Sequence, residues 1–143
     1  MDVTGVGAVR LCHATTRNDT EIVLVDSRVD AYRDAFAGTA EPTVVLGHTH
    51  MPFDRLADRR RFVNPGSVGM PYGRAGAHWA LLADGAVTLR RTVYDAEAAC
   101  AAIRDQSGYP DAAEWADYFV HARASDADAL AAFAPRDGRA VAC

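Results

Sequence analysis

Two histidines separated by one residue are the part of this sequence best suited to chemistry. His48 and His50 lie in the segment Gly47-His48-Thr49-His50, directly after the apolar run Thr43-Val44-Val45-Leu46. If the run is a β-strand that continues in extended form, side chains two positions apart leave the same face, so both imidazoles can serve one site. Imidazole suits zinc, manganese, iron and nickel, and the pair therefore predicts a metal site.

A third histidine follows another predicted strand. Residues 8–12 form a short apolar run that delivers His13 at its end. Loops at strand ends are where α/β proteins place ligands and catalytic groups. A single loop histidine is usually an ordinary residue, but three at strand ends favour a shared metal site. His78 and His121 are predicted to be packing or surface residues.

The order of predicted elements indicates a mixed α/β (α+β) fold. A helix over residues 29–36, capped by Ser27 and ended by Gly38, connects the two histidine-bearing strands. Residues 61–63 form a further strand, and a hairpin turns at Asp84-Gly85. Helical periodicity follows in residues 95–106, 111–123 and 125–133. We expect a mixed sheet with helices packed on one side and a helical carboxyl-terminal region.

Composition narrows the class of protein. The chain has 143 residues, of which 50% are hydrophobic and 24% charged, as in ordinary globular domains. We expect one domain over residues 1–134 and a flexible tail over 135–143. The net charge of -4 disfavours general nucleic-acid binding. The absence of a C-x-x-C pair, a signal peptide or a membrane-length apolar stretch predicts a cytoplasmic protein with no membrane partner.

Three segments together carry a resemblance to a known family. The segments Cys12-His13-Ala14-Thr15, Gly47-His48-Thr49-His50-Met51-Pro52 and Asn64-Pro65-Gly66-Ser67-Val68-Gly69 resemble, in type, order and spacing, the closing half of the calcineurin-like metallophosphoesterase superfamily. The branch most similar to them is that of the small bacterial phosphodiesterases. The resemblance implies that residues 1–134 are the carboxyl-terminal portion of such a domain, with the front half absent. It also implies part of a four-layer α/β/β/α sandwich.

The resemblance implies a metal-dependent phosphoesterase that hydrolyses a phosphodiester or phosphomonoester with two divalent cations, drawn from manganese, zinc, iron or nickel. His13 and His48 would bind one cation and His50 the other. Two neighbouring cations can deprotonate a water and neutralise phosphate oxygens. Asn64 and Ser67 would either hold the loop or touch phosphate. Arg17 is a candidate for binding a phosphate oxygen, although a solvated loop arginine is the simpler interpretation.

The family's front half carries Asp-x-His, Gly-Asp and Gly-Asn-His-Asp segments, and none occurs here. Those segments supply the bridging carboxylate, an asparagine ligand and the histidine acid, so no catalytic residue is assigned. Thr16 also departs from the family, which usually has proline there. We therefore expect a chain that is incomplete or inactive alone: a truncated product, one half of a split enzyme or a decayed relative. An unpaired apolar sheet face would dock a complementary amino-terminal half or a second copy.

The same residues are also compatible with other functions. A non-catalytic metal-binding or interaction module using the same three histidines stays open. A metal-free phosphoesterase with two H-x-T motifs is disfavoured, because only His13-Ala14-Thr15 fits that pattern. A nucleophilic Cys12 paired with His13 is also disfavoured, because neighbouring strand residues point to opposite faces.

Overall fold

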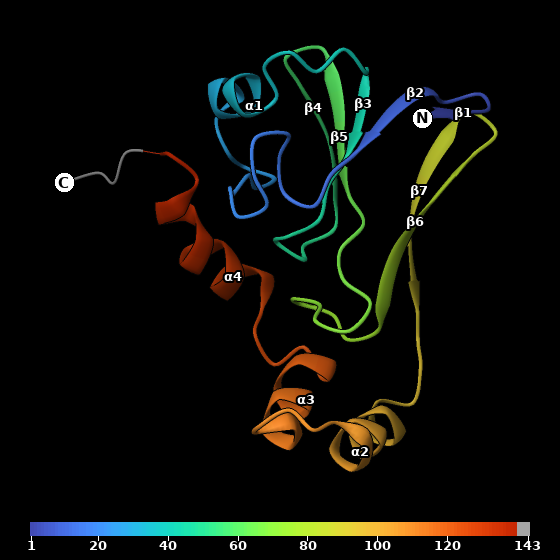
Figure 1. Ribbon diagram of the computed structural model, residues 1–143, viewed down its shortest axis with the longest axis vertical. Coiled ribbons are helices and arrows are strands. Elements are labelled where there is room, and N and C mark those ends of the chain that lie inside the picture. The colour runs from blue at the N-terminus through green and yellow to red at the C-terminus, as the bar shows by residue number, and fades with distance from the viewer. Residues whose placement is uncertain (140–143) are drawn as a thin grey trace.

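The strands form a five-stranded mixed sheet and a separate two-stranded hairpin (Figure 1). The computed structural model describes residues 1–139. The strands are β1 (Asp2–Val3), β2 (Gly7–Leu11), β3 (Thr43–Val45), β4 (Phe53–Ala57), β5 (Arg60–Asn64), β6 (Ala77–Ala83) and β7 (Ala86–Thr92). The helices are α1 (Val29–Ala35), α2 (Ala96–Gln106), α3 (Ala112–Val120) and α4 (Asp126–Phe133), followed by a short 3-10 helix, Ala134–Arg136. The chain is therefore a mixed α/β protein, as the sequence predicts.

Three neighbouring parallel strands define the edge of the sheet that matters for function. The strand order is β1-β2-β3-β5-β4, in which β2, β3 and β5 are parallel and the two outer strands are antiparallel. Leu11 lies opposite Val45, and Val45 lies opposite Val63. All three parallel strands consequently end at one edge, and the segments that follow them lie side by side. The three histidines predicted as ligands all belong to these segments.

An aromatic cluster holds α1 against the sheet. Tyr32 and Phe36 from the α1 region meet Phe62 of β5, with ring centroids 4.6 Å and 4.8 Å from that of Phe62. All three side chains are fully buried. Val44 of β3 belongs to the same apolar cluster. This packing stabilises the strand-helix-strand unit that connects His13 to the second histidine segment.

One correction to the sequence prediction concerns Ser27. Arg28 is the residue that precedes α1, and it makes no side-chain cap. The Ser27 hydroxyl instead accepts a hydrogen bond from the Leu24 amide at 2.8 Å and donates to the Asp137 carboxylate. The prediction that Ser27 caps the helix is wrong, because Arg28 is the N-cap residue and the Ser27 hydroxyl is engaged with the Leu24 amide and the buried carboxylate of Asp137.

Another correction concerns two strands that were not predicted. β1 is only two residues long. Apolar and polar residues do not alternate in the sequence of β4, because the apolar Leu56 is on its exposed face, with 77% exposure. The turn between β4 and β5 is Asp58-Arg59, with positive φ values of 47° and 65°. This turn has no glycine and gives no hairpin signal in the sequence. The predicted hairpin at Asp84-Gly85 is confirmed, with φ values of 52° and 78°.

The carboxyl-terminal helices lie in two places. α2 and α3 pack against each other at the end of the molecule opposite α1, whereas α4 returns toward the loops of the sheet (Figure 1). Ser125 begins α4 with a capping box shared with Asp128. Ala129 of α4 then packs against Ile22 and Met51. The end of the chain is thereby brought back to the histidine-bearing edge.

Residues 135–139 contact the body of the protein, in contrast to the tail predicted for 135–143. The side chain of Asp137 is fully buried beneath Arg139 and bonds to Ser27. Arg139 also forms an ion pair with Asp26 at 2.9 Å. Residues 140–143 of the predicted tail lie outside the described residues. Within residues 1–139, no helix combines the length and the apolar character needed to cross a membrane.

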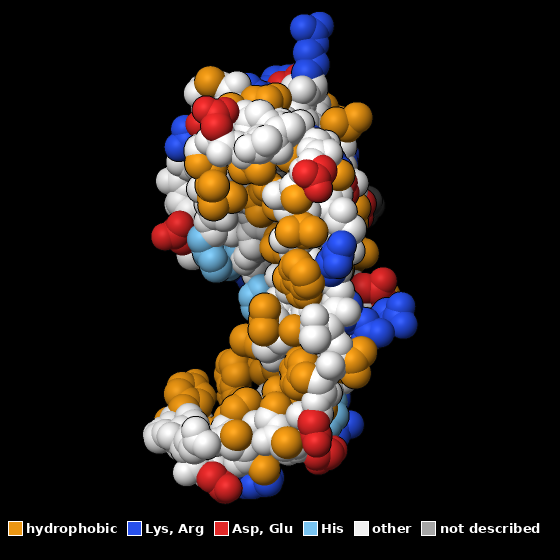
Figure 2. All heavy atoms as spheres, turned by 90° about the vertical axis from the view of Figure 1, so that its right-hand side faces the viewer, with side chains coloured by type: hydrophobic (Ala, Val, Ile, Leu, Met, Phe, Trp, Pro, Cys, Tyr) orange, Lys and Arg blue, Asp and Glu red, His pale blue; other side chains and the backbone are white. Residues whose placement is uncertain are grey.

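The β6–β7 hairpin carries partly exposed apolar side chains. Trp79 and Leu81 of β6, on one face of the hairpin, are 36% and 39% exposed, and Leu89 of β7, on the other face, is 36% exposed. Figure 2 shows hydrophobic side chains gathered along this side of the molecule, from the hairpin to the helices below. The hairpin therefore exposes apolar side chains on both of its faces, and their contact with a partner stays a prediction.

Replacing Phe62 tests the aromatic cluster. We expect Phe62→Ala to lower the free energy of unfolding by about 3–5 kcal/mol, because the substitution leaves a cavity between Tyr32 and Phe36. Urea denaturation measures the change. The control is Leu56→Ala on the neighbouring strand, which should cost less than about 0.5 kcal/mol because its side chain is exposed. Equal, small losses for both variants would contradict the assignment of Phe62 to the core.

Candidate metal centre

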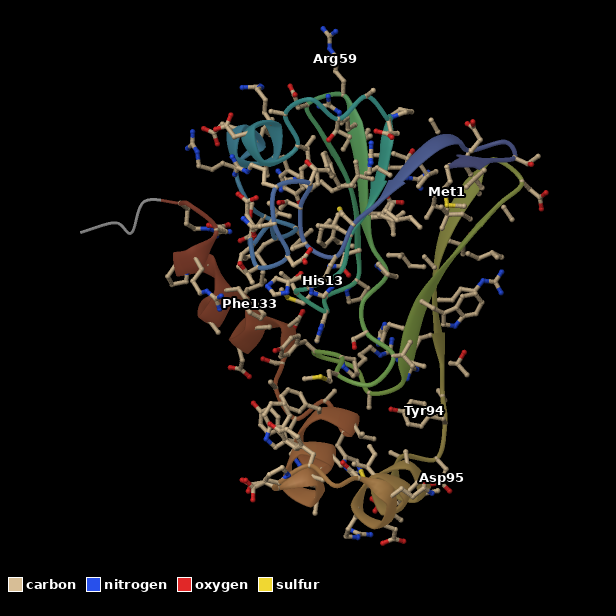
Figure 3. All side chains as sticks on the ribbon, viewed as in Figure 1. Met1, His13, Arg59, Tyr94, Asp95 and Phe133 are labelled. Atoms are coloured by element: carbon tan, nitrogen blue, oxygen red, sulfur yellow. The ribbon has the colours of Figure 1, made fainter. Side chains whose placement is uncertain are left out.

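The structure brings His13 and His48 together at the carboxyl edge of the parallel strands. Their backbones are linked, since the Gly47 amide donates to the His13 carbonyl at 2.7 Å. Their rings approach with His13 Nε2 and His48 Nδ1 separated by 3.1 Å. Figure 3 shows His13 at the end of the sheet nearest to α4, which carries Phe133. Two side chains that are 35 positions apart in sequence thus share one site.

The separation of the two nitrogens fits a shared cation. Ligand nitrogens about 2.1 Å from a metal lie roughly 3.0–3.4 Å apart at octahedral or tetrahedral angles. The 3.1 Å between His13 and His48 falls within that range. In the absence of metal, the same two nitrogens can share one N–H···N hydrogen bond when one nitrogen carries a hydrogen and the other does not, which two neutral rings allow. The pair is therefore a suitable two-ligand edge for one divalent cation.

The surroundings of His48 favour its neutral form. Burial is the largest effect that lowers the pKa of His48, followed by the nearby positive charges of His13, His50 and Arg136. Burial also lowers the pKa of His50, although the hydrogen bond to the Met70 carbonyl opposes this. A histidine must be neutral to bind a metal, so both environments suit ligands.

His50 lies apart from the pair. Its Nδ1 is 3.1 Å from the Met70 carbonyl oxygen, and its ring stacks on Tyr72 with centroids 6.3 Å apart. The Met70 carbonyl selects the tautomer with hydrogen on Nδ1, which leaves Nε2 as the potential ligand atom. The structure thus places His50 beside the pair and not within it.

The expectation that His48 and His50 share a face of an extended segment is wrong. Both residues have left-handed backbone, with φ values of 59° and 58°. Thr49 between them is buried, and its amide bonds to the Gly47 carbonyl at 2.7 Å, which turns the chain sharply. Non-glycine residues in this region of φ cost of order 1–3 kcal/mol and persist only where surrounding contacts impose them. Such strain often marks functional loops.

Asn64 imposes this loop conformation. Its amide nitrogen donates to the Gly47 carbonyl at 2.8 Å and to the Thr49 hydroxyl at 3.1 Å. Its amide oxygen accepts from the Gly66 amide at 2.9 Å, and the whole side chain is buried. Of the two roles considered for Asn64, this geometry supports holding the loop, because the amide has no exposed atom to offer phosphate.

Ser67 and Arg17, the other two predicted substrate-binding residues, are also engaged with protein. The Ser67 hydroxyl accepts from the Met70 amide at 3.0 Å and so shapes the turn that presents the Met70 carbonyl to His50. The Arg17 guanidinium binds both carboxylate oxygens of Glu21 and lowers the pKa of that carboxyl group. Contact of either residue with substrate stays a prediction.

Some site residues could not be found from local sequence. Tyr72 stacks on His50 and meets Phe133 of α4, with ring centroids 6.0 Å apart. Arg136 lies close enough to contribute to the lowered pKa of His48, although the sequence assigned it to the tail. His78 and His121 lie outside the site. His78 contacts the Arg74 carbonyl, and His121 contacts Asp117 and Glu97.

The number of converging ligands limits what this chain can hold. Within residues 1–139, no group of three histidine, cysteine or carboxylate side chains is close enough to hold a metal. A structural metal site usually needs four protein ligands and a catalytic site three. The His13–His48 pair therefore fits one edge of a cation site, and the described residues do not complete a binuclear centre.

Comparisons with known proteins place this fold. A model of the calcineurin-like phosphoesterase superfamily domain matches residues 3–84. The crystal structure of a hypothetical protein from Pyrococcus horikoshii OT3 is similar at 21% identity, with a TM-score of 0.64, over 82% of this chain and 47% of that chain. A metallophosphoesterase from Sphaerobacter thermophilus is similar at 23% identity, with a TM-score of 0.61, over 73% of this chain and 53% of that chain.

At these identities the two structures show likeness of fold alone, and this chain spans about half the length of each. No curated protein matches the sequence.

Replacing Asn64 tests its control of the histidine loop. We expect Asn64→Asp to lower the free energy of unfolding by at least about 2 kcal/mol, because it removes two donated hydrogen bonds and places a carboxylate against the Gly47 carbonyl. Urea denaturation at neutral pH measures this. Asn18→Asp is the matched control, since Asn18 uses its side-chain oxygen as an acceptor from the Thr20 and Glu21 amides, which aspartate retains. Equal tolerance of both variants would show that Asn64 does not hold the loop.

Proposed function

Because this chain belongs to the calcineurin-like phosphoesterase superfamily, we propose that it supplies the histidine-bearing half of a metal-dependent phosphoesterase site. The observation that carries the proposal is the 3.1 Å separation of His13 Nε2 and His48 Nδ1 at the carboxyl edge of the sheet. The backbone strain at His48 and His50 supports it, because the fold maintains a costly conformation in the loop that carries these rings.

Each histidine has a defined role in this proposal. His13 and His48 hold one divalent cation through Nε2 and Nδ1, and His50 offers Nε2 to a second while the Met70 carbonyl fixes its ring. The cations, which we infer to be manganese, zinc, iron or nickel, would supply an activated water and neutralise phosphate charge. Asn64 keeps the histidine loop in place. The substrate class is a phosphodiester or phosphomonoester.

The carboxylate ligands must come from elsewhere. Two converging imidazoles cannot enclose a cation, and residues 1–139 bring no acidic group to them. A second copy of this chain would bring the same histidines and no new motif. We therefore propose a complementary polypeptide segment that carries the carboxylates and docks on the exposed apolar side chains of the β6–β7 hairpin.

A non-catalytic metal-binding module is the second candidate. The absence of a third converging ligand within the described residues favours it over hydrolysis by this chain alone. The two candidates share the metal site and differ in whether a complementary segment restores activity. The cytoplasmic location and the lack of general nucleic-acid binding stay predictions.

Metal binding tests what the two candidates share. We expect the chain to bind Mn²⁺ or Zn²⁺, and His48→Ala to weaken binding at least about tenfold because it removes one of the two converging ligands. Isothermal titration calorimetry measures the affinity. His121→Ala is the control, since His121 contacts Asp117 and Glu97 away from the site. No binding by the unaltered chain, or equal affinity after His48→Ala, would exclude a metal site at His48.

Complementation tests hydrolysis. We expect co-expression with a segment that carries Asp-x-His, Gly-Asp and Gly-Asn-His-Asp motifs to produce metal-dependent hydrolysis of bis(p-nitrophenyl) phosphate, because that segment adds the missing ligands and acid. His48→Ala in the complex should abolish the activity. A stable, metal-loaded complex without hydrolysis would leave the non-catalytic module as the function.

A further inference from the structure

A charged cavity of about 430 Å³ lies between the loop after His13, the α1 region and the carboxyl-terminal turn. Four arginines contribute to its lining: Arg17, Arg28, Arg136 and Arg139. Arg17 and Arg28 are far in sequence from Arg136 and Arg139, and the return of α4 to the sheet brings the two pairs together (Figure 1). Phosphate groups are bound by arginine in many proteins, because the planar guanidinium donates two parallel hydrogen bonds.

Three of the four arginines are neutralised by carboxylates. Their ion pairs are Arg17 with Glu21, Arg28 with Asp30, and Arg139 with both Asp26 and Asp137. Within residues 1–139, Arg136 makes no ion pair with any acidic side chain. One further carboxylate of the cavity, Asp34, faces it from the α1 side, where it acts on Arg17. Arg136 is therefore the arginine whose charge is available to a ligand.

The backbone on both sides of Arg136 is held firmly. Before it, Phe133 packs against Tyr72, which stacks on His50, and Ala134 packs against the apolar cluster around Met51. After it, the buried Asp137 accepts a hydrogen bond from Ser27. An exposed side chain on an anchored turn can reach outward without the segment itself having to fold on binding.

Packing connects the segment of Arg136 to the histidine side of the cavity, because Phe133, three residues earlier, packs against Tyr72, which stacks on His50. The positive charge of Arg136 is also among the groups that lower the pKa of His48. The backbone of Thr20 also acts on that ring, and the next residue, Glu21, lines the cavity. The histidine pair and the cavity are therefore neighbours separated by the loop after His13.

We propose that Arg136 binds a phosphate oxygen of the ligand held at the His13–His48 site. This inference rests on the proposed function, and it assigns to Arg136 the role that the sequence predicted for Arg17. Arg17 is bound to Glu21 on both carboxylate oxygens, whereas Arg136 has an exposed side chain that makes no ion pair within residues 1–139. An anion between Arg136 and a cation on the histidines would be attracted from both sides. The carboxyl-terminal turn would thus form one wall of the phosphate site.

Binding of inorganic phosphate tests this role. Phosphate affinity is measured by calorimetry on the full chain, with and without Mn²⁺, for the unaltered protein and for Arg136→Gln, Arg136→Lys and Arg28→Gln. We expect Arg136→Gln to weaken phosphate binding about tenfold or more, and Arg136→Lys to recover part of the loss because it keeps the charge but not the paired donors. Arg28→Gln is the matched control, because Arg28 lines the same cavity but is already paired with Asp30.

The outcomes separate this inference from the proposed function. Unchanged phosphate affinity in Arg136→Gln, an equal loss in Arg28→Gln, or no phosphate binding by the unaltered chain would overturn the inference. Thermal melting checks that each variant is folded, and Mn²⁺ titration of the same samples reports on the metal site. Phosphate binding that depends on Arg136 in a chain that binds no metal would reject the proposed function and keep only the assignment of Arg136 as a phosphate-binding residue. Metal binding with a phosphate affinity that does not depend on Arg136 would reject the inference and keep the proposed function.

Discussion

The parallel pairing of β2, β3 and β5 is the constraint on which the rest of the structure depends. It carries three chain segments to one edge of the sheet, where Leu11, Val45 and Val63 stand in line. The loops after β2 and β3 then supply His13 and His48, and Asn64 is the last residue of β5. The Asn64 amide secures the result, because its hydrogen bonds to Gly47 and Thr49 keep the loop in a conformation that it would not adopt alone. The parallel pairing of these strands and the buried Asn64 side chain together position a histidine pair that is suited to one cation.

The carboxyl-terminal segment closes the same region from the opposite side. Ala129 of α4 packs on Ile22 and Met51, which flank the two histidine loops, and the aromatic contact of Phe133 with Tyr72 leads directly to His50. Beyond α4, the buried Asp137 joins Ser27 across 110 positions of sequence. α4 is therefore part of the histidine site's surroundings, although the family model matches only residues 3–84.

Local patterns predicted the elements whose signal lies within a few residues. The hairpin at Asp84-Gly85, the apolar strand before Gly47 and the capped helix after Ser125 are examples. The predictions that were wrong involve competition across the chain, as when Asp137 takes the hydroxyl of Ser27. The three histidines could be selected as candidates from their positions after strands, but the turn at Thr49 that separates His50 from His48 depends on the buried Asn64. Arg136 has no local signal at all, because only the return of α4 brings it to the cavity.

The central claim is that His13 and His48 bind one cation together. X-ray absorption spectroscopy of the zinc-loaded chain tests this most directly, because multiple scattering from imidazole rings reports how many histidines bind the metal. We expect at least two imidazole ligands in the unaltered chain and the loss of one in His13→Ala, because the two nitrogens lie 3.1 Å apart. A spectrum without imidazole scattering, or one unchanged by His13→Ala, would contradict it.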